Sequence, residues 1–345
     1  MGLRVALVGA GQVAEVHLQA LGETSAAEVV GIFDQDQARA HERAVANRVP
    51  RVYAAWDELL KDDAAECVGV LLPHDLHERF TVEALQAGKH VVCEKPMGQT
   101  VGEMDRMLSA ARAAGRKLLP VHNRVYSHAV ERLHEIVESG QIGQVILGQT
   151  TGFEGPRTVS VRPWLATERG GGGVLIAQAV HPAYVLRWML GDVARVSCQF
   201  GELKVVDMTC EDTAIATLKF RSGAVAEMTA TFGIAHGPFE HSIVLHGRDG
   251  YAQLGVRSRS PQQRFGLQVI SPKAFGDPEL HDVEIPAPDL SATSFRRMWE
   301  DYARGILEGP PTRVSGEDGK RAVEIILAAY RSNETGRTVD LPLTG

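Results

Sequence analysis

A glycine-rich turn near the start of the chain is the first group of residues suited to chemistry. It follows the apolar run Leu3–Val8 and reads Gly9-Ala-Gly-Gln-Val-Ala14, in the G-x-G-x-x-A form. The first glycine permits a tight turn, the second lets the backbone approach a pyrophosphate, and the following helix offers N–H groups to that anion. Asp34, after the next apolar run, can accept hydrogen bonds from ribose hydroxyls. These residues predict a dinucleotide site that prefers NAD to NADP, since a 2′-phosphate would meet a like charge unless Arg39 offsets it.

A lysine at the end of a predicted buried strand is the second chemical signal. The apolar run His90–Cys93 is followed by Glu94-Lys95-Pro96. Ligands of parallel sheets bind outside the carboxyl ends of the strands, so Lys95 can reach a substrate oxygen and bind it or move its proton. The peptide bond to Pro96 keeps Lys95 extended and can be cis. A solvated lysine at a strand end is the alternative interpretation.

A histidine on a predicted helix after a glycine run is the third signal. The helix is expected from Val174 to about Leu190. Ala177, His181 and Tyr184 share one of its faces, and the opposite face is apolar. His181 can therefore face a ligand and hold or carry a proton, although a lone helix histidine is more often structural.

The elements that must position these residues fall into two patterns. Apolar runs alternate with helical segments in the first third of the chain, which predicts a doubly wound parallel sheet. Later strands follow one another through short turns, which predicts a mostly antiparallel open sheet. These strands are Ala194–Phe200, Asp212–Phe220, Ala224–Phe232 and Ser242–His246. We therefore expect an α/β protein with two domains, residues 1–122 and 123–345.

The composition excludes several classes of protein. A net charge of −7 over 345 residues argues against nucleic acid or an anionic membrane as the main partner. No secretory signal or long apolar span is evident, and the four cysteines are scattered in apolar runs, so we expect a cytoplasmic protein without disulfides. The absence of Cys-x-x-Cys and His-x-x-x-His clusters argues against a metal site.

The motifs occur in the order of a known family. They are Gly9-Ala-Gly11, Asp34, Glu94-Lys-Pro96, Gly171-Gly-Gly173, His181 and Tyr330-Arg-Ser-Asn-Glu-Thr-Gly336. Over its whole length the chain resembles the glucose–fructose oxidoreductase / inositol dehydrogenase family, often called Gfo/Idh/MocA. The resemblance implies an N-terminal Rossmann domain, a C-terminal α/β domain with a large open sheet, and NAD(P)-dependent redox chemistry on sugars, cyclitols or their derivatives.

The resemblance also implies roles for individual residues. The family's catalytic lysine and histidine fall on Lys95 and His181, its histidine near the nicotinamide ribose falls on His77, and a substrate-side residue falls on Arg124. We predict that the cofactor is bound by Gly9, Ala10, Gly11, Gln12, Val13, Asp34, Leu72, Pro73, His74, His77, Glu94 and Lys95. We predict that the substrate is bound by Lys95, Arg124, Trp164, Gln178, His181 and Tyr184.

Two departures from the family pattern concern the substrate side. Many members have an aspartate one helical turn before the histidine, where this chain has Ala177. Family patterns also often show Thr-Pro-Asn where this chain has Leu72-Pro-His74. The imidazole therefore lacks the usual carboxylate, and we expect an unusual substrate pocket or an altered activity.

The favoured hypothesis is a dehydrogenase that moves hydride between nicotinamide C4 and a CH–OH carbon of a sugar, sugar acid, cyclitol or glycoside. One alternative is an NAD-using lyase or glycosidase that acts through transient sugar oxidation. Another is a non-catalytic, dinucleotide-binding sensor. An open sheet with one face uncovered should bury that face against another subunit, so we expect a homodimer or homotetramer.

Overall fold

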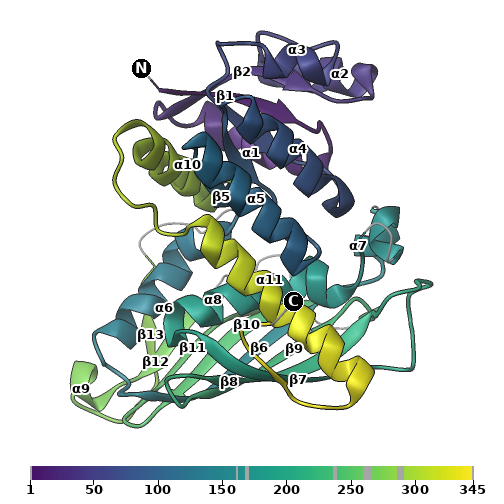
Figure 1. Ribbon diagram of the computed structural model, residues 1–345. Helices are drawn as coiled ribbons and strands as arrows, with labels where there is room; N and C mark the ends of the chain where they lie inside the picture. The colour runs from purple at the N-terminus through teal and green to yellow at the C-terminus, as the bar shows by residue number, and fades with distance from the viewer. Residues whose placement is uncertain are drawn as a thin grey trace. The chain divides into compact units, whose positions relative to one another are not determined.

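The computed structural model describes residues 2–160, 162–167, 171–235, 239–258, 266–285 and 291–343. Contacts between residues divide the chain into two compact units (Figure 1). Unit 1 comprises Met1–Tyr126 and Leu290–Lys320, and unit 2 comprises Ser127–Asp289 and Arg321–Gly345. The predicted boundary assigned every residue after 122 to the second domain, so the return of residues 290–320 to unit 1 is a feature that the sequence did not predict.

A five-stranded parallel sheet forms the core of unit 1, with strand order β2-β1-β3-β4-β5. Its strands are β1 (Leu3–Val8), β2 (Ala27–Phe33), β3 (Cys67–Val70), β4 (His90–Cys93) and β5 (Leu118–Pro120). Every neighbouring pair is parallel, and β3 is buried along its whole length. The short apolar runs therefore form the buried parallel strands that the sequence predicted.

Helices complete unit 1. They are α1 (Gln12–Gly22), α2 (Gln37–Asn47), α3 (Trp56–Leu60), α4 (His77–Gln86), α5 (Val101–Ala114) and α10 (Ser291–Leu307). The start of α5 is capped by Thr100, whose hydroxyl accepts a hydrogen bond from the Glu103 amide at 3.2 Å, and Gly115 ends the helix at φ 62°. Helix α10 packs against α1, which accounts for the return of the chain to this unit.

A nine-stranded mixed sheet forms the core of unit 2, with order β13-β12-β11-β10-β6-β9-β8-β7-β14. Its strands are β6 (Val145–Phe153), β7 (Val193–Phe200), β8 (Thr213–Phe220), β9 (Val225–Thr231), β10 (Phe239–Gly247), β11 (Tyr251–Ser258), β12 (Gly266–Ile270), β13 (His281–Val283) and β14 (Val339–Asp340). The β6–β9 pair is parallel, and the other pairs are antiparallel. The predicted mostly antiparallel sheet is confirmed.

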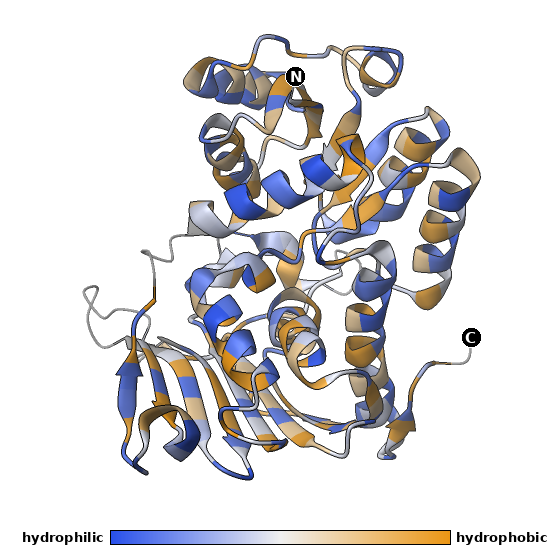
Figure 2. Ribbon diagram, turned by 90° about the vertical axis from the view of Figure 1, so that its left-hand side faces the viewer, coloured by the Kyte–Doolittle hydropathy of each residue, from blue (hydrophilic) through white to orange (hydrophobic). Residues whose placement is uncertain are grey.

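The two faces of this sheet differ in their surroundings. Residues alternate between buried and exposed along β8, and the strands in Figure 2 alternate between apolar and polar colours. Helices α6 (His128–Glu138) and α8 (Val180–Leu190) contact strands of the sheet, and α11 (Gly316–Thr335) starts in unit 1 and continues in unit 2. The shorter helices of this unit are α7 (Arg157–Ser160) and α9 (Pro272–Phe275). In the described ranges, no helix is both long enough and apolar enough to cross a bilayer.

Candidate active site

The glycine turn has the geometry of a phosphate-binding loop. Gly9 has φ +101°, and a Cβ at this position would lie 2.2 Å from the carbonyl oxygen of Leu71, so only glycine fits. In the described part of the chain, no atom lies within 4 Å of a Cβ built on Gly11. This open space leaves the backbone at the start of α1 accessible to an anion, and Gly11 as N-cap has no side chain to cover it. The turn therefore fits the pyrophosphate of a dinucleotide.

Asp34 lies directly after β2, as predicted, and its carboxylate already has several hydrogen bonds. It accepts from the amides of Ala10 at 2.7 Å and Asp36 at 2.9 Å, and from Nη2 of Arg39 at 2.8 Å. Burial alone would raise the pKa of Asp34, but the hydrogen bonds from Arg39 and the two amides outweigh it and lower that pKa. The carboxylate is thus ionised and oriented, with an arginine beside it.

The loop after β4 holds the predicted catalytic lysine. Lys95 is half-buried, its peptide bond to Pro96 is cis, and its amide donates to Oε2 of Glu94 at 3.0 Å. The neighbouring loop after β3 contains Leu72, and His77 lies at the start of α4. The side chain of His77 reaches the backbone next to the lysine, at Pro96.

His77 connects the loops after β3 and β4. Its Nδ1 lies 2.7 Å from the carbonyl oxygen of Pro96, and its Nε2 lies 2.8 Å from that of Leu72. Carbonyl oxygens only accept hydrogen bonds, so both ring nitrogens must donate and the fully buried imidazole must be charged. Burial by itself lowers the pKa of His77, but Cys93 and the two carbonyl groups outweigh it and raise the pKa to about 9.

His181 lies on α8 in unit 2, and its imidazole is within hydrogen-bond distance of a tyrosine hydroxyl. Its Nδ1 lies 2.8 Å from the hydroxyl of Tyr184, three residues later on the same helix. Ala177, in the preceding turn of π-helix (Leu175–Ala179), offers no carboxylate. The sequence predicted that no acidic residue one turn back holds the histidine, and the structure shows that Tyr184, one turn ahead, contacts it. A π-helical turn is frequent at functional sites.

A buried carboxylate holds the start of this helix, and the sequence did not single it out. Oε1 of Glu211 accepts hydrogen bonds from the Leu175 amide and from the Tyr330 hydroxyl, both at 2.9 Å. A Cβ on Gly173 would lie 2.4 Å from Oε2 of Glu211, and φ is +111° there, which explains the last glycine of the run. Burial raises the pKa of Glu211 to about 7. The available signal was the acidic pair before β8, Glu211-Asp212.

The remaining predicted substrate residues lie in both units. Arg124 is half-buried in the 3₁₀ turn Asn123–Tyr126 of unit 1. Trp164 is half-buried in the turn Pro163–Ala166 of unit 2. Gln178 is buried, with Nε2 3.5 Å from Nδ1 of His241. Unit 1 thus carries Lys95 and Arg124, and unit 2 carries Trp164, Gln178, His181 and Tyr184.

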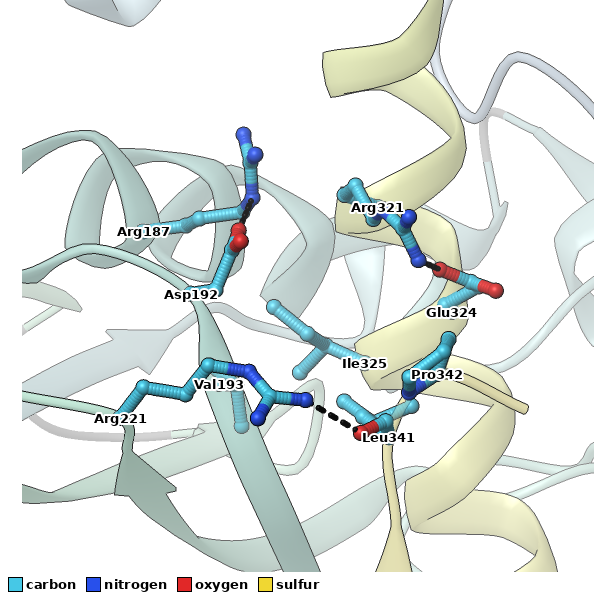
Figure 3. Close-up of a pocket in the computed structure, with 9 residues that line it drawn as sticks. All are labelled: Arg187, Asp192, Val193, Arg221, Arg321, Glu324, Ile325, Leu341 and Pro342. Carbon is cyan, nitrogen blue, oxygen red and sulfur yellow. Dashed lines mark hydrogen bonds and ion pairs between the residues drawn. The ribbon is translucent and has the colours of Figure 1, made fainter.

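A separate pocket in unit 2 lies beside the C-terminal strand (Figure 3). It is lined by Arg187, Asp192, Val193, Arg221, Arg321, Glu324, Ile325, Leu341 and Pro342. All three arginines have partners: Arg187 pairs with Asp192, Arg321 pairs with Glu324, and Arg221 donates to the Leu341 carbonyl. None of these lining residues was predicted to bind cofactor or substrate. The hydrogen bond from Arg221 holds the backbone at Leu341, and the pocket is not the candidate active site.

The fold and the glycine turn define a class of protein: a Rossmann domain for a dinucleotide followed by an α/β domain built on a large open sheet. Residues 3–122 match the family model for an oxidoreductase family with an NAD-binding Rossmann fold, GFO_IDH_MocA. Residues 130–253 match the C-terminal domain of the same family. The chain belongs to the Gfo/Idh/MocA family of oxidoreductases.

Relatives span nearly the whole chain. Myo-inositol 2-dehydrogenase of Thermotoga maritima is 26% identical over 344 residues, covering 98% of each chain. D-glucoside 3-dehydrogenase of Escherichia coli K12 is 26% identical and covers 98% of this chain and 97% of its own. A solved structure of levoglucosan dehydrogenase, in complex with NADH and levoglucosan, superimposes with a TM-score of 0.88 at 22% identity, over 99% of this chain and 100% of that one. At this identity the structural match supports the fold.

Proposed function

We propose that this chain is an NAD-dependent dehydrogenase that transfers hydride between nicotinamide C4 and a CH–OH carbon of a sugar, sugar acid, cyclitol or glycoside. The observation that carries the proposal is Lys95, half-buried at the carboxyl end of β4 in the same unit as the glycine turn. Members of this family with an intact lysine at that position are expected to use it on a substrate oxygen. The missing carboxylate at Ala177 favours the sensor hypothesis, and the intact Glu94-Lys95-Pro96 motif argues against it.

We expect the cofactor site to use the residues predicted from sequence. The backbone from Gly9 to Val13 would hold the pyrophosphate, and Asp34 would accept from the adenosine ribose. Two loops would line the nicotinamide side, and His77 is hydrogen-bonded to the backbone of both. The loops contain Leu72, Pro73, His74, Glu94 and Lys95. When bound, NAD supplies the carbon that accepts the hydride.

The proton is handled by two side chains in this proposal. Lys95 would take the proton from the substrate hydroxyl, because an amine that is partly shielded from water is a competent general base. His181 would hydrogen-bond to the same substrate, with its ring oriented by Tyr184 at 2.8 Å. Arg124, Trp164 and Gln178 would contact the remainder of the substrate.

The substrate class is supported by the names of relatives, which act on a cyclitol and on a glucoside. The test is a screen of sugars, sugar acids, cyclitols and glycosides with NAD and with NADP, followed by NADH or NADPH absorbance. We expect steady NADH formation with at least one compound class and its loss in Lys95→Ala. Product formation from a glycoside without net NADH would support the lyase or glycosidase alternative instead.

Assembly and location complete the proposal. Ile215 on β8 is 49% exposed and Val225 on β9 is 42% exposed, so part of the sheet presents apolar side chains to solvent in the single chain. A homodimer or homotetramer would cover them, and light scattering at micromolar concentration tests this. All four cysteines lie in the described residues, where they are buried and form no disulfide, which suits a reducing compartment, so we propose a cytoplasmic location that cell fractionation can test.

A further inference from the structure

A buried chain of polar side chains runs through unit 1 behind the catalytic loop. Nε1 of Trp299, on α10, donates to Nδ1 of His17 at 3.1 Å. Nε2 of His17, on α1, lies 3.0 Å from Oε1 of Glu94. Trp299 and His17 are both 0% exposed, and Glu94 is 6% exposed. Three elements that are far apart in sequence are thus joined by two hydrogen bonds in the core.

The direction of these hydrogen bonds follows from the chemistry of the groups. An indole N–H can only donate, so Nδ1 of His17 must be an unprotonated acceptor. The proton of the imidazole is therefore on Nε2, which donates to the carboxylate of Glu94. Burial raises the pKa of Glu94, but the hydrogen bonds from His17 and the Lys95 amide, together with the Lys95 charge, act in the opposite direction, and the pKa is lowered. Glu94 is ionised, and its position is set by a ring of defined tautomer.

The chain ends on the backbone of the lysine. The other oxygen of Glu94, Oε2, accepts from the Lys95 amide at 3.0 Å. The carboxylate therefore links a ring on α1 to the peptide group that carries the Lys95 side chain. Phe295 packs edge-on against the ring of His17, with centroids 4.7 Å apart, and limits its rotation.

We propose that Trp299 and His17 are positioning residues for Lys95: Trp299 holds the Nε2–H tautomer of His17, His17 anchors the Glu94 carboxylate, and Glu94 fixes the Lys95 backbone. The inference rests on the proposed function only where it gives Lys95 a catalytic role. Burying polar groups costs free energy that apolar packing would not, so a fully buried polar chain in this place serves orientation. It also gives a reason for the return of residues 290–320 to unit 1.

The first part of the test needs no activity. We would label histidine and lysine with ¹⁵N and measure the ring shifts of His17 and the exchange of the Lys95 amide in the full chain. The wild-type ring should show protonated Nε2 and unprotonated Nδ1. Trp299→Phe should shift the Nδ1 signal, because that nitrogen loses its donor. A matched control is Trp56→Phe, which removes another indole donor of unit 1, the one that donates to Glu83 at 2.6 Å; it should change neither signal. Protonated Nδ1 in the wild-type protein would overturn the proposal.

The variants of His17 separate positioning from packing. His17→Leu should speed exchange of the Lys95 amide at least tenfold, and His17→Gln, which keeps a donor toward Glu94, should restore most of the protection. With a substrate from the screen, His17→Leu should lower kcat about 10- to 100-fold with NAD affinity unchanged, and Trp299→Phe about two- to tenfold.

Unchanged Lys95 exchange in a folded His17→Leu variant would refute the positioning role, even if kcat falls. If the wild-type protein turns over no substrate, the proposed function fails, and the ring shifts and amide exchange still decide this inference. Equal loss in His17→Leu and His17→Gln would also contradict it, since only the first removes the donor to Glu94.

Discussion

The charged imidazole of His77 predicts a loss of stability at alkaline pH. Both ring nitrogens of this fully buried residue face carbonyl oxygens, at 2.7 and 2.8 Å. When the ring loses a proton, one of the two hydrogen bonds must be lost, and a carbonyl oxygen of the loop after β3 or β4 is left without that donor. The test therefore changes the pH and compares the stability of the wild-type protein with that of a variant that cannot titrate at position 77.

The sign and size follow from linkage. The pKa of His77 is raised from 6.5 to about 9 in the folded protein, so the folded state binds the proton more tightly than the unfolded state. The stabilisation is fully present below pH 6.5 and is lost as the pH rises through about 9. The shift corresponds to about 3 kcal/mol of unfolding free energy.

The assay is urea unfolding of the wild-type protein and His77→Gln at pH values from about 6 to about 10. Glutamine keeps N–H donors but does not titrate, so ionisable groups that do not interact with His77 cancel in the difference between the two proteins. The variant should be less stable near pH 6, and the gap should narrow by about 3 kcal/mol at high pH. His41→Gln, at an exposed position of unit 1, is the control. A gap for His77→Gln that does not change with pH would refute the assignment of a charged imidazole.

Three further predictions concern the two units. The pKa of Glu211 is raised by burial from 4.5 to about 7, so the folded state holds this proton more tightly and loses stability as the pH rises from about 4.5 to about 7; Glu211→Gln should remove about 3 kcal/mol of that dependence in urea unfolding. Arg39→Ala leaves Asp34 without its cation and should weaken NADP binding about tenfold with NAD binding nearly unchanged, by titration of both cofactors. Lys95→Ala should lower kcat by roughly 10²–10⁴, and Tyr184→Phe should lower kcat by a smaller factor. A larger loss of kcat in Tyr184→Phe, measured by steady-state kinetics, would contradict the main role of Lys95 in proton transfer.

Local features of the fold were predictable because their causes are local. The turn at Gly9 and the buried strand that ends at Cys93 each depend on residues a few positions apart, and the structure has both. The sheet types followed from the order of strands and helices, and the family resemblance supplied Lys95 and His181 as candidates.

Long-range pairings were not predictable, because spacing along the chain says nothing about partners in space. Trp299 contacts His17 across 282 positions, and Tyr330 contacts Glu211 across 119. The sequence placed Tyr184 on the face of the histidine but did not predict a hydrogen bond between them, since that depends on rotamers in the buried helix.

Net hydride transfer is the central claim, and isotope transfer tests it most directly. A substrate from the screen would carry deuterium on the CH–OH carbon, and the reduced cofactor would be analysed by mass spectrometry. The account predicts that the deuterium appears in NADH in proportion to product, and that Lys95→Ala slows its transfer. Product formation with the deuterium released to water, or retained in the product without NADH, would contradict a dehydrogenase.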